Sequence, residues 1–438
     1  MRAGSGAVRT VSEHRAVVAA LLPLTPIESR PLAQTLGLVL AQEVGSPIAL
    51  PPFDNSAMDG YAVQAADVAG ASEATPVRLP VAQDIPAGRT DSPRHEPGTA
   101  HRIMTGAPMP PGADAVVPVE HTGGYGAGTA TDGGTSSGTG DGTGGATGVG
   151  NEVRIDRPAR LGAHVRRAGE DVAAGIPILT AGTVLGAAQL GLAAAVGLAE
   201  LPVRRPPSVL VLSTGSELVA PGQPLEHGQI YESNGVMLAA AVTEAGGVAE
   251  RLSSVPDEVD EFLAALRRRF SDGVPDLLLT SGGVSAGAYE VVKDALAERG
   301  VQFVRVAMQP GGPQGAGRLS GVGYGSGVPV VTLPGNPVSS QVSFEVFVRP
   351  ALRAAMGHPH PDRPAVRVRL GESLRSPAGK RQFRRGTLDA VNGTVRTVGG
   401  PGSHLLSALA RADCLIVLDG DREEHVEGDE VEVWLLER

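Results

Sequence analysis

The feature that most constrains the fold is a regular alternation of short apolar runs and helical patterns between residues 208 and 356. Runs of strand length, bounded by small polar residues, are typical of buried strands in a parallel sheet. The strands are predicted at 208–212, 248–255, 277–279, 301–307 and 328–333, and the main helices at 234–245, 289–298 and 338–356. The pattern predicts an α/β domain with a doubly wound, mostly parallel sheet.

Unusual residues follow each of the five predicted strands. The segments are 213–217, 256–257, 281–285, 309–314 and 334–337, and they carry glycines, prolines, hydroxyls or acids. Ligands bind such sheets beyond the carboxyl ends of the strands. Tight turns alone would explain any one segment, but five of them together predict a ligand site at this edge.

The segment after the third strand has the most specific pattern. Ser281, Gly282, Gly283 and Ser285 leave backbone N–H groups uncovered where a helix is predicted to begin. Such a turn is a typical phosphate cradle. Tight packing in an ordinary strand-turn-helix unit is the alternative.

Three acids lie in or beside these segments, namely Glu217, Asp257 and Glu290. Their charge would repel an oxyanion across a short gap in a low-dielectric site. A divalent cation such as Mg²⁺ would resolve the conflict, because it binds both carboxylate and phosphate oxygens. Alternatively, Asp257 is only a helix N-cap and Glu290 serves only the helix macrodipole.

Asn234 and Ser12 are also expected as N-caps, of the helices at 234–245 and 11–22.

The N-terminal half predicts a small β-rich domain with two polar turns. Asp59 lies in the proline-led turn 51–61, and Thr105 lies in the Thr-Gly turn of 101–112. Asp171 follows in the charged turn 165–172. Each is a candidate site residue, although Asx-turns, turn hydrogen bonds or a solvated surface would also account for them. The Gly-rich, low-complexity segment 121–150 predicts a disordered insertion.

Composition limits the partners and the setting. A chain of 438 residues is too long for one core, so several domains are expected. The formal net charge of −10 gives no general attraction for nucleic acid or an anionic membrane. The single cysteine, Cys414, excludes an intrachain disulfide and is expected to be a buried small hydrophobe. Without a signal peptide or a membrane span in prospect, we expect a cytoplasmic protein.

Seven ordered motifs resemble those of the molybdopterin molybdotransferases, the family that includes the second enzymatic domain of gephyrin. They are PPFDNSAMDGYA, IMTGAPMPPGADAVV, RRAGEDV, STGSELV, GQIYESN, SGGVSAGAYEVVKDAL and LPGNPVSS. The resemblance runs from about residue 11 to the C-terminus and omits 121–150. SGGVS or LPGNP alone would also fit the related molybdopterin adenylyltransferases.

The resemblance implies an enzyme that takes adenylated molybdopterin and molybdate, inserts molybdenum and releases AMP, with Mg²⁺ as the usual metal. It implies a homodimer in which Asp59 and Thr105 reach the site from the other subunit, with Asp171 nearby. Glu217, Asp257 and Glu290 would hold the metal and line the nucleotide side. The residues expected to bind the cofactor are Thr214, Gly215, Ser281, Gly282, Gly283, Ser285, Pro334, Gly335, Asn336 and Pro337.

Four domains are expected on the same basis. They are an elongated linker domain (27–46 and 151–177), a small β-rich domain (47–150), the α/β molybdopterin-binding domain (8–26 and 178–358) and a C-terminal β-barrel (359–438). A nucleotidyl-transfer enzyme like the adenylyltransferases, or a non-enzymatic cofactor-binding scaffold, remains an alternative function. The adenylyltransferase that supplies the substrate is a candidate partner.

One segment departs from the family pattern. Relatives often have lysines in a K-P-G-K-P sequence where this chain has Gln309 to Pro313, QPGGP. Losing these cations weakens anion binding, unless Lys293, Arg305 or Arg318 compensates or the activity itself has diverged. Glu290 also replaces an aspartate that is usual in relatives. His404 is expected either at a pocket edge or, slightly favoured, in a capped turn.

Overall fold

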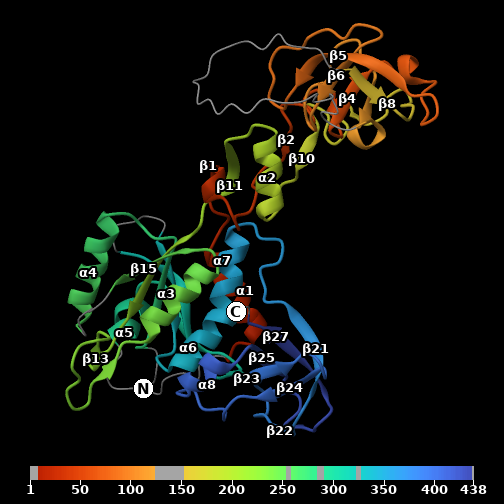
Figure 1. Ribbon diagram of the computed structural model, residues 1–438. Coiled ribbons are helices and arrows are strands. Elements are labelled where there is room, and N and C mark those ends of the chain that lie inside the picture. The colour runs from red at the N-terminus through yellow and green to blue at the C-terminus, as the bar shows by residue number, and fades with distance from the viewer. Residues whose placement is uncertain (1–7, 124–151, 253–257, 284–290, 322–326, 437–438) are drawn as a thin grey trace, which may run out of the picture. The chain divides into compact units, whose positions relative to one another are not determined.

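The computed structural model describes residues 8–123, 152–252, 258–283, 291–321 and 327–436 (Figure 1). Asp257, Ser285 and Glu290 lie outside these ranges, as does the predicted insertion apart from residues 121–123. The chain forms two compact units. One comprises Met1–Gln42, Thr180–Ala187 and Glu200–Arg438, and the other comprises Glu43–Leu179 and Ala188–Ala199.

A six-stranded sheet forms the centre of the first unit, in the order β15-β12-β16-β20-β19-β17. Strands β15, β12, β16 and β20 pair in parallel, whereas β19 runs antiparallel between β20 and β17. The prediction of a mostly parallel sheet is therefore confirmed. The strands are β12 (Ser208–Ser213), β15 (Val248–Leu252), β16 (Leu277–Ser281), β17 (Val301–Arg305), β19 (Pro313–Leu319) and β20 (Val328–Leu333).

Strand β19 was not predicted, because its sequence PQGAGRL shows neither an apolar run nor an alternation. Its glycines are required by close packing. A Cβ on Gly315 would collide with the Thr332 hydroxyl, and one on Gly317 would collide with the Gly300 carbonyl. Small residues therefore let this strand approach its two neighbours, at the expense of a recognisable strand pattern.

Helices cover both faces of this sheet (Figure 1). Odd-numbered residues of β12, Val209 and Val211, pack with α1, α3 and α6, whereas Leu210 and Leu212 pack with α4 and α5. This period of two is what the strand geometry dictates. The helices are α1 (Val11–Leu21), α3 (Asn234–Glu244), α4 (Val259–Ser271), α5 (Val291–Ala297), α6 (Pro337–Ser343) and α7 (Arg349–Ala355).

Three details of the predicted helices were wrong. The N-cap of α1 is Thr10, not Ser12, because Thr10 and Glu13 form a reciprocal capping box. Helix α3 has Ser233 at its N-cap, so Asn234 lies inside the helix. The helix predicted over 338–356 is interrupted by a π-helical segment, η4 (Phe344–Val348), ahead of Pro350, which lacks the N–H that a continuous α-helix needs.

The C-terminal part of the first unit is a closed five-stranded barrel, in the order β23-β24-β21-β27-β25, with β25 pairing back to β23. Its strands are β21 (Ala365–Leu370), β23 (Arg381–Asp389), β24 (Thr394–Thr397), β25 (Cys414–Leu418) and β27 (Glu430–Leu435). Cys414 is fully buried, and burial raises the pKa of its thiol. The predictions of a barrel and of a buried thiol are both confirmed. Short elements beside the barrel are β18 (Met308–Gln309), β22 (Leu374–Arg375), β26 (Glu424–His425) and α8 (Leu406–Arg411).

The second unit contains a five-stranded sheet, in the order β7-β4-β6-β5-β8. Its strands are β4 (Gly60–Val63), β5 (Val77–Ile85), β6 (Ala100–Ile103), β7 (Ala115–Pro118) and β8 (Glu152–Ile155). The start of the predicted insertion is ordered, because Gly123 donates its N–H to the Arg154 carbonyl at 3.0 Å. Two-stranded pairs complete the unit, formed by β3 (Asn55–Ser56) with β9 (Val165–Arg166) and by β2 (Val44–Gly45) with β10 (Pro177–Leu179).

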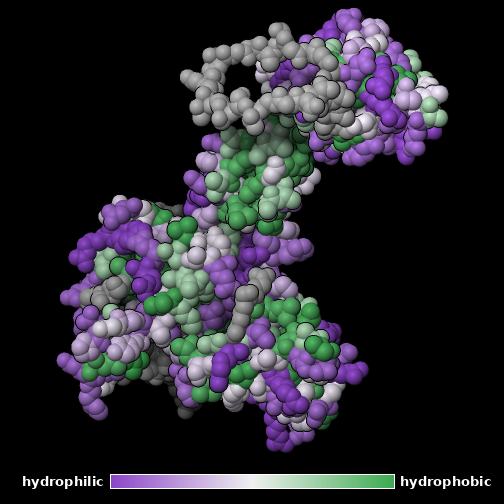
Figure 2. Space-filling model, viewed as in Figure 1, coloured by the Kyte–Doolittle hydropathy of each residue, from purple (hydrophilic) through white to green (hydrophobic). Residues whose placement is uncertain are grey.

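Apolar surface is concentrated on helix α2 (Ala187–Ala195), whereas α4 is covered by hydrophilic residues (Figure 2). Ala188, Gly191, Ala194 and Ala195 are exposed on α2. Within the described ranges no helix has both the length and the apolar composition needed to cross a bilayer. Strand β11 (Glu200–Arg204) follows α2 in the sequence. It belongs to the first unit and pairs there with β1 (Ile27–Pro31).

Helix α1 buries a histidine whose imidazole makes no hydrogen bond to a described residue. Both ring nitrogens of His14 lack partners among the described residues, and its ring meets Phe347 edge-on at 4.7 Å between centroids. Burial lowers the pKa of His14 from 6.5 to about 4. The imidazole is therefore neutral in the folded protein at neutral pH.

The folded protein is expected to lose stability on acidification because of His14. The unfolded state binds a proton near pH 6.5 and the folded state only near pH 4, so the free energy of unfolding falls as the pH drops through this window. The contribution is about 3 kcal/mol. His14→Leu is expected to flatten the dependence of the urea midpoint on pH, whereas His227→Leu, at an exposed position, is the control. An unchanged slope in His14→Leu would contradict the assignment.

Candidate functional site

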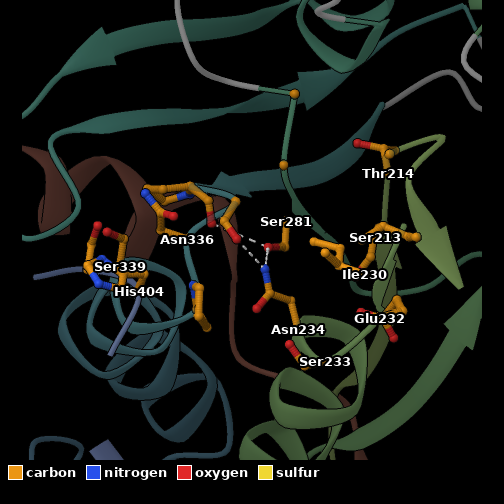
Figure 3. A pocket seen from close by; sticks show the side chains of 18 of the residues that line it. Ser213, Thr214, Ile230, Glu232, Ser233, Asn234, Ser281, Asn336, Ser339 and His404 are labelled. Carbon is orange, nitrogen blue, oxygen red and sulfur yellow. Dashed lines mark hydrogen bonds between the residues drawn. The ribbon is translucent and has the colours of Figure 1, made fainter. Parts of the chain in front are cut away.

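One large pocket opens at the carboxyl edge of the central sheet, with a volume of about 1620 Å³. Loops after β12, β16, β17 and β20 line it, together with the start of α4, the start of α3 and a loop from the barrel (Figure 3). The loop residues include 213–218, 281–283, 309–311 and 334–337, and the barrel contributes 401–404 and 406. The predicted convergence of the strand ends is therefore confirmed for the described segments.

The glycine turn after β16 joins three of these loops. Gly282 donates its N–H to the Leu333 carbonyl at 3.1 Å, and Thr214 donates to the Ser281 carbonyl at 3.3 Å. Gly282 has φ +98° and Gly283 has φ +67°, which favour glycine. A Cβ on Gly282 would lie 2.9 Å from the Thr214 carbonyl oxygen, and one on Gly283 would lie 2.9 Å from Val292. Both conformation and space require glycine here.

A polar network holds the next loops in register (Figure 3). Asn234 Nδ2 donates to Ser281 Oγ at 2.9 Å and to the Gly335 carbonyl at 2.6 Å. Ser281 Oγ is 3.3 Å from the Pro334 carbonyl, to which it donates, and 3.2 Å from Ser340 Oγ. The start of α3, the end of β16 and the loop after β20 therefore depend on one another.

The charged side chains that line the described part of the pocket are all acidic, apart from His404. They are Glu217, Glu232, Glu258 and Asp294, and no lysine or arginine is among the described lining residues. The Glu217 carboxylate lies directly over Gly215, where a Cβ would meet its Oε2 at 2.5 Å. Glu232 Oε1 accepts the Gly235 N–H at 2.5 Å. Such a pocket attracts cations and, by itself, disfavours an anion.

Segment 309–313 carries no cation into the pocket. The Gln309 side chain accepts a hydrogen bond from Gln382 Nε2 of the barrel at 2.6 Å. Lys293, Arg305 and Arg318 are absent from the described lining, and Arg318 donates instead to the Leu21 carbonyl at 2.9 Å. The proposed compensation by these three residues therefore finds no support in the described pocket.

The barrel contributes the loop that contains His404, which lies in the pocket (Figure 3). Ser403 accepts the Val338 N–H on its carbonyl at 3.1 Å, which ties the loop to the start of α6. Behind it, buried Arg385 donates to the Gly400 carbonyl. His404 thus lies in a turn and also lines the pocket, so the two alternatives given for it are compatible. Arg384, which is also buried, precedes Arg385 on strand β23.

Most of the predicted site residues that the structure describes lie in this pocket. They are Thr214, Gly215, Glu217, Ser281, Gly282, Gly283, Pro334, Gly335, Asn336 and Pro337. Nothing can be placed for Asp257, Ser285 and Glu290, which lie outside the described residues. The N-cap of α4 is the next residue, Glu258.

Asp59 and Thr105 belong to the second unit and contact each other. Asp59 Oδ1 accepts both the Thr105 N–H at 2.6 Å and the Thr105 hydroxyl at 2.8 Å. The backbone N–H of Thr105 is the main reason that the pKa of Asp59 is lowered, followed by its hydroxyl. Asp171 lies in a separate turn, where its N–H donates to the Leu50 carbonyl at 3.0 Å.

Sequence reasoning missed several pocket residues, chiefly Asn234, Glu232, Ser339 and Tyr231. Segment 230–234 reaches the pocket because β14 (Ile230–Tyr231) pairs in parallel with β13 (Leu218–Val219), next to Glu217. Strands of two residues leave no periodicity to detect. The polar run Glu232-Ser233-Asn234 before a helix was the available signal, and it was taken for capping alone.

Comparison with known proteins identifies the family. Three family models match consecutive parts of the chain: "MoeA N-terminal region (domain I and II)" at 9–197, "Probable molybdopterin binding domain" at 210–354 and "MoeA C-terminal region (domain IV)" at 367–436. Molybdopterin molybdenumtransferase 2 of Mycobacterium tuberculosis is 52% identical, over 98% of this chain and 100% of that protein. The chain belongs to the molybdopterin molybdenumtransferase (MoeA) family. The predicted resemblance is confirmed.

Other members of this family also match this chain over nearly its whole length. Molybdopterin molybdenumtransferase 1 of Mycobacterium tuberculosis is 38% identical over 98% of this chain and 99% of its own length. A crystal structure of a MoeA protein from Pyrococcus horikoshii superposes with a TM-score of 0.77 at 32% identity, covering 99% of this chain and 100% of that chain. A second structure from this organism gives a TM-score of 0.73 at 26% identity, covering 98% and 100%. The MoeA-type fold expected from the motifs is therefore confirmed.

Proposed function

We propose that this chain transfers molybdenum to molybdopterin, taking the adenylated form of molybdopterin and molybdate and releasing AMP. As a member of the molybdopterin molybdenumtransferase family, it is a transferase of molybdenum cofactor biosynthesis. The observation that carries the more detailed proposal is the pocket, in which loops from four strand ends surround about 1620 Å³. This volume suits a ligand with a nucleotide at one end and a pterin at the other.

The two ends of the pocket differ in chemistry. Acids, including Glu217 and Glu232, gather beside the loops after β12 and β14, whereas Asn336, Ser339 and His404 line the side formed by α6 and the barrel loop. Buried Arg385, which donates to the Gly400 carbonyl, lies behind that second side and gives it a positive field. We place the diphosphate and nucleotide on the acidic side and the molybdate oxyanion on the other.

The donor set on the acidic side fits a divalent cation. Carboxylate oxygens without a competing lysine or arginine suit Mg²⁺, which needs only one or two protein carboxylates when substrate phosphates and water complete its shell. Within the described ranges no three His, Cys, Asp or Glu side chains form a group that could hold a metal ion. Of the three predicted ligands only Glu217 lies among the described residues, so we assign the ion to Glu217. Bound there, Mg²⁺ would neutralise phosphate charge and polarise the diphosphate.

The protein's own groups bind and orient the substrate. The backbone N–H of Gly283 holds a phosphate oxygen, because that of Gly282 already donates to the Leu333 carbonyl, and the Asn234 network keeps this turn in register with the loop after β20. In a homodimer, Asp59 and Thr105 of a second copy would complete the site. The exposed small residues of α2 support such an association. We also propose the four domain ranges that the sequence predicts. We place the reaction in the cytoplasm, with an adenylyltransferase as the supplier of substrate.

Removal of metal is expected to abolish turnover. Exhaustive chelation with EDTA should reduce AMP release to background, and added Mg²⁺ should restore it, because the acidic pocket cannot otherwise accept a diphosphate. Glu217→Gln should raise the Mg²⁺ concentration for half-maximal rate on the order of tenfold. Glu226→Gln is the matched control, since Glu226 is exposed and lies outside the pocket lining. Unchanged turnover after chelation would refute the metal.

One incubation tests the function itself. Purified protein is mixed with adenylated molybdopterin, molybdate and Mg²⁺, and AMP and molybdenum cofactor are measured together. Release of AMP in step with cofactor supports the proposal. Consumption of ATP with release of pyrophosphate would instead indicate nucleotidyl transfer, and binding without either product would indicate a scaffold.

A further inference from the structure

The side-chain amide of Asn234 has a fixed orientation in the pocket. One amide atom lies 2.6 Å from the Gly335 carbonyl and 2.9 Å from Ser281 Oγ. A carbonyl oxygen only accepts hydrogen bonds, so the atom that faces Gly335 must be the amino nitrogen. Both N–H bonds of Asn234 are therefore used within the protein, and Oδ1 is directed away from them.

Oδ1 of Asn234 is buried and accepts no hydrogen bond from any described residue. Ser213 Oγ, at the end of β12, is in the same condition. Both residues line the pocket, and of its described lining residues only these two have such an atom. A Cβ built on Gly235 would lie 3.1 Å from Ser213 Oγ, so Ser213 is next to the start of α3.

Buried polar atoms nearly always have a partner in a folded protein or its complexes. An amide oxygen can only accept, so the partner of Oδ1 is a hydrogen on nitrogen or oxygen, or else a metal cation. Phosphate and molybdate oxyanions offer no such hydrogen, and the carbonyl dipole would repel them. Pterin and adenine both carry an amino group beside a ring nitrogen, which is the donor edge that Oδ1 lacks.

We propose that Asn234 Oδ1 accepts a hydrogen bond from the amino edge of the substrate's nitrogen heterocycle. Asn234 thereby has two roles: its amino group joins the loops, and its oxygen selects the heterocycle. The inference rests on the proposed function, since it assigns the heterocycle of that substrate to this position. It also sets the direction in which the substrate lies across the pocket.

The test compares ligands with and without the amino group by isothermal titration calorimetry. One pair is AMP and purine riboside monophosphate, and the other is pterin and 4-hydroxypteridine, which is pterin without its amino group. The wild type is expected to prefer the amino-bearing member of one pair by about tenfold. Preference within the AMP pair assigns adenine to this position, and preference within the pterin pair assigns pterin.

Three variants separate the two roles of Asn234. Asn234→Ala removes both the amino group and the oxygen, so the two members of a pair should bind with about equal affinity. Asn234→Asp loses the N–H donors but keeps an acceptor oxygen, so it should retain the preference. Ser340→Ala is the matched control, because Ser340 contacts Ser281 in the same network but does not line the pocket. This variant should also retain the preference for the amino-bearing ligand.

Inorganic pyrophosphate, which has no N–H group, measures damage to the loops alone. If Asn234→Ala weakens pyrophosphate and all four heterocycles equally, Asn234 is only structural and the inference is overturned. A wild-type protein that binds these ligands without preference in either pair also overturns it, while AMP release in the turnover assay leaves the proposed function intact. Failure of both binding and turnover would remove the proposed function as well.

Discussion

Replacing Glu345 with alanine is expected to lower the free energy of unfolding by about 4 kcal/mol. Glu345 lies in η4 with its side chain only 2% exposed, and it accepts hydrogen bonds from Arg363 Nε at 2.9 Å and Nη2 at 3.2 Å. Arg349 faces the same carboxylate at 3.8 Å, and both arginine side chains are 3% exposed. Alanine would leave Arg349 and Arg363 beside a cavity where their shared anion had been, although Arg363 keeps its ion pair with Glu244.

The size of this effect comes from burial, and an exposed pair provides the comparison. Arg375 and Glu424 form an ion pair in which the side chains are 83% and 67% exposed. Glu424→Ala is expected to change stability by less than about 1 kcal/mol. Chemical denaturation of the two variants beside the wild type measures the difference. Equal small changes would show that Glu345 is not the group that neutralises the cluster.

Gly282→Ala is expected to lower turnover by about 100-fold or more while the protein stays folded. The residue has φ +98°, which costs an alanine roughly 1–2 kcal/mol. Its methyl group would also lie 2.9 Å from the Thr214 carbonyl oxygen, so the loop after β12 must move. Displacing the turn, and with it the neighbouring Gly283 N–H, by even 1 Å can cost about 100-fold in rate.

Gly222→Ala is the matched control for backbone strain. Gly222 has φ +92°, but a Cβ there would meet nothing within 4 Å. Both variants should lose stability from backbone strain in thermal denaturation, Gly282→Ala the more because of its added clash, and only Gly282→Ala should lose turnover. If both variants keep the wild-type rate, the turn at Gly282 does not hold the substrate.

The sequence was informative wherever a local pattern determines the structure. Apolar runs predicted the parallel strands, and the composition of the segments after them predicted a shared site, because parallel strands end at one edge of the sheet. Glu217, Gly282 and Pro334 could be assigned to the pocket in this way.

Other features depend on contacts between distant segments. Asn234 joins the pocket through Gly335, and His404 enters it from the barrel, so both roles depend on partners that are distant in sequence. Strand β19 was missed because glycines demanded by Thr332 and Gly300 replace its apolar residues. The π-helical segment was missed because Phe344–Val348 contains no glycine or proline that would mark a break in the helix.

The loop around Ser403 has a thermodynamic consequence. It belongs to the barrel, yet its carbonyl accepts the Val338 N–H and its neighbours line the pocket of the sheet domain. A ligand held between the two surfaces binds only while both are folded, so mass action couples their unfolding equilibria. Substrate should thus make sheet and barrel melt as a single cooperative unit.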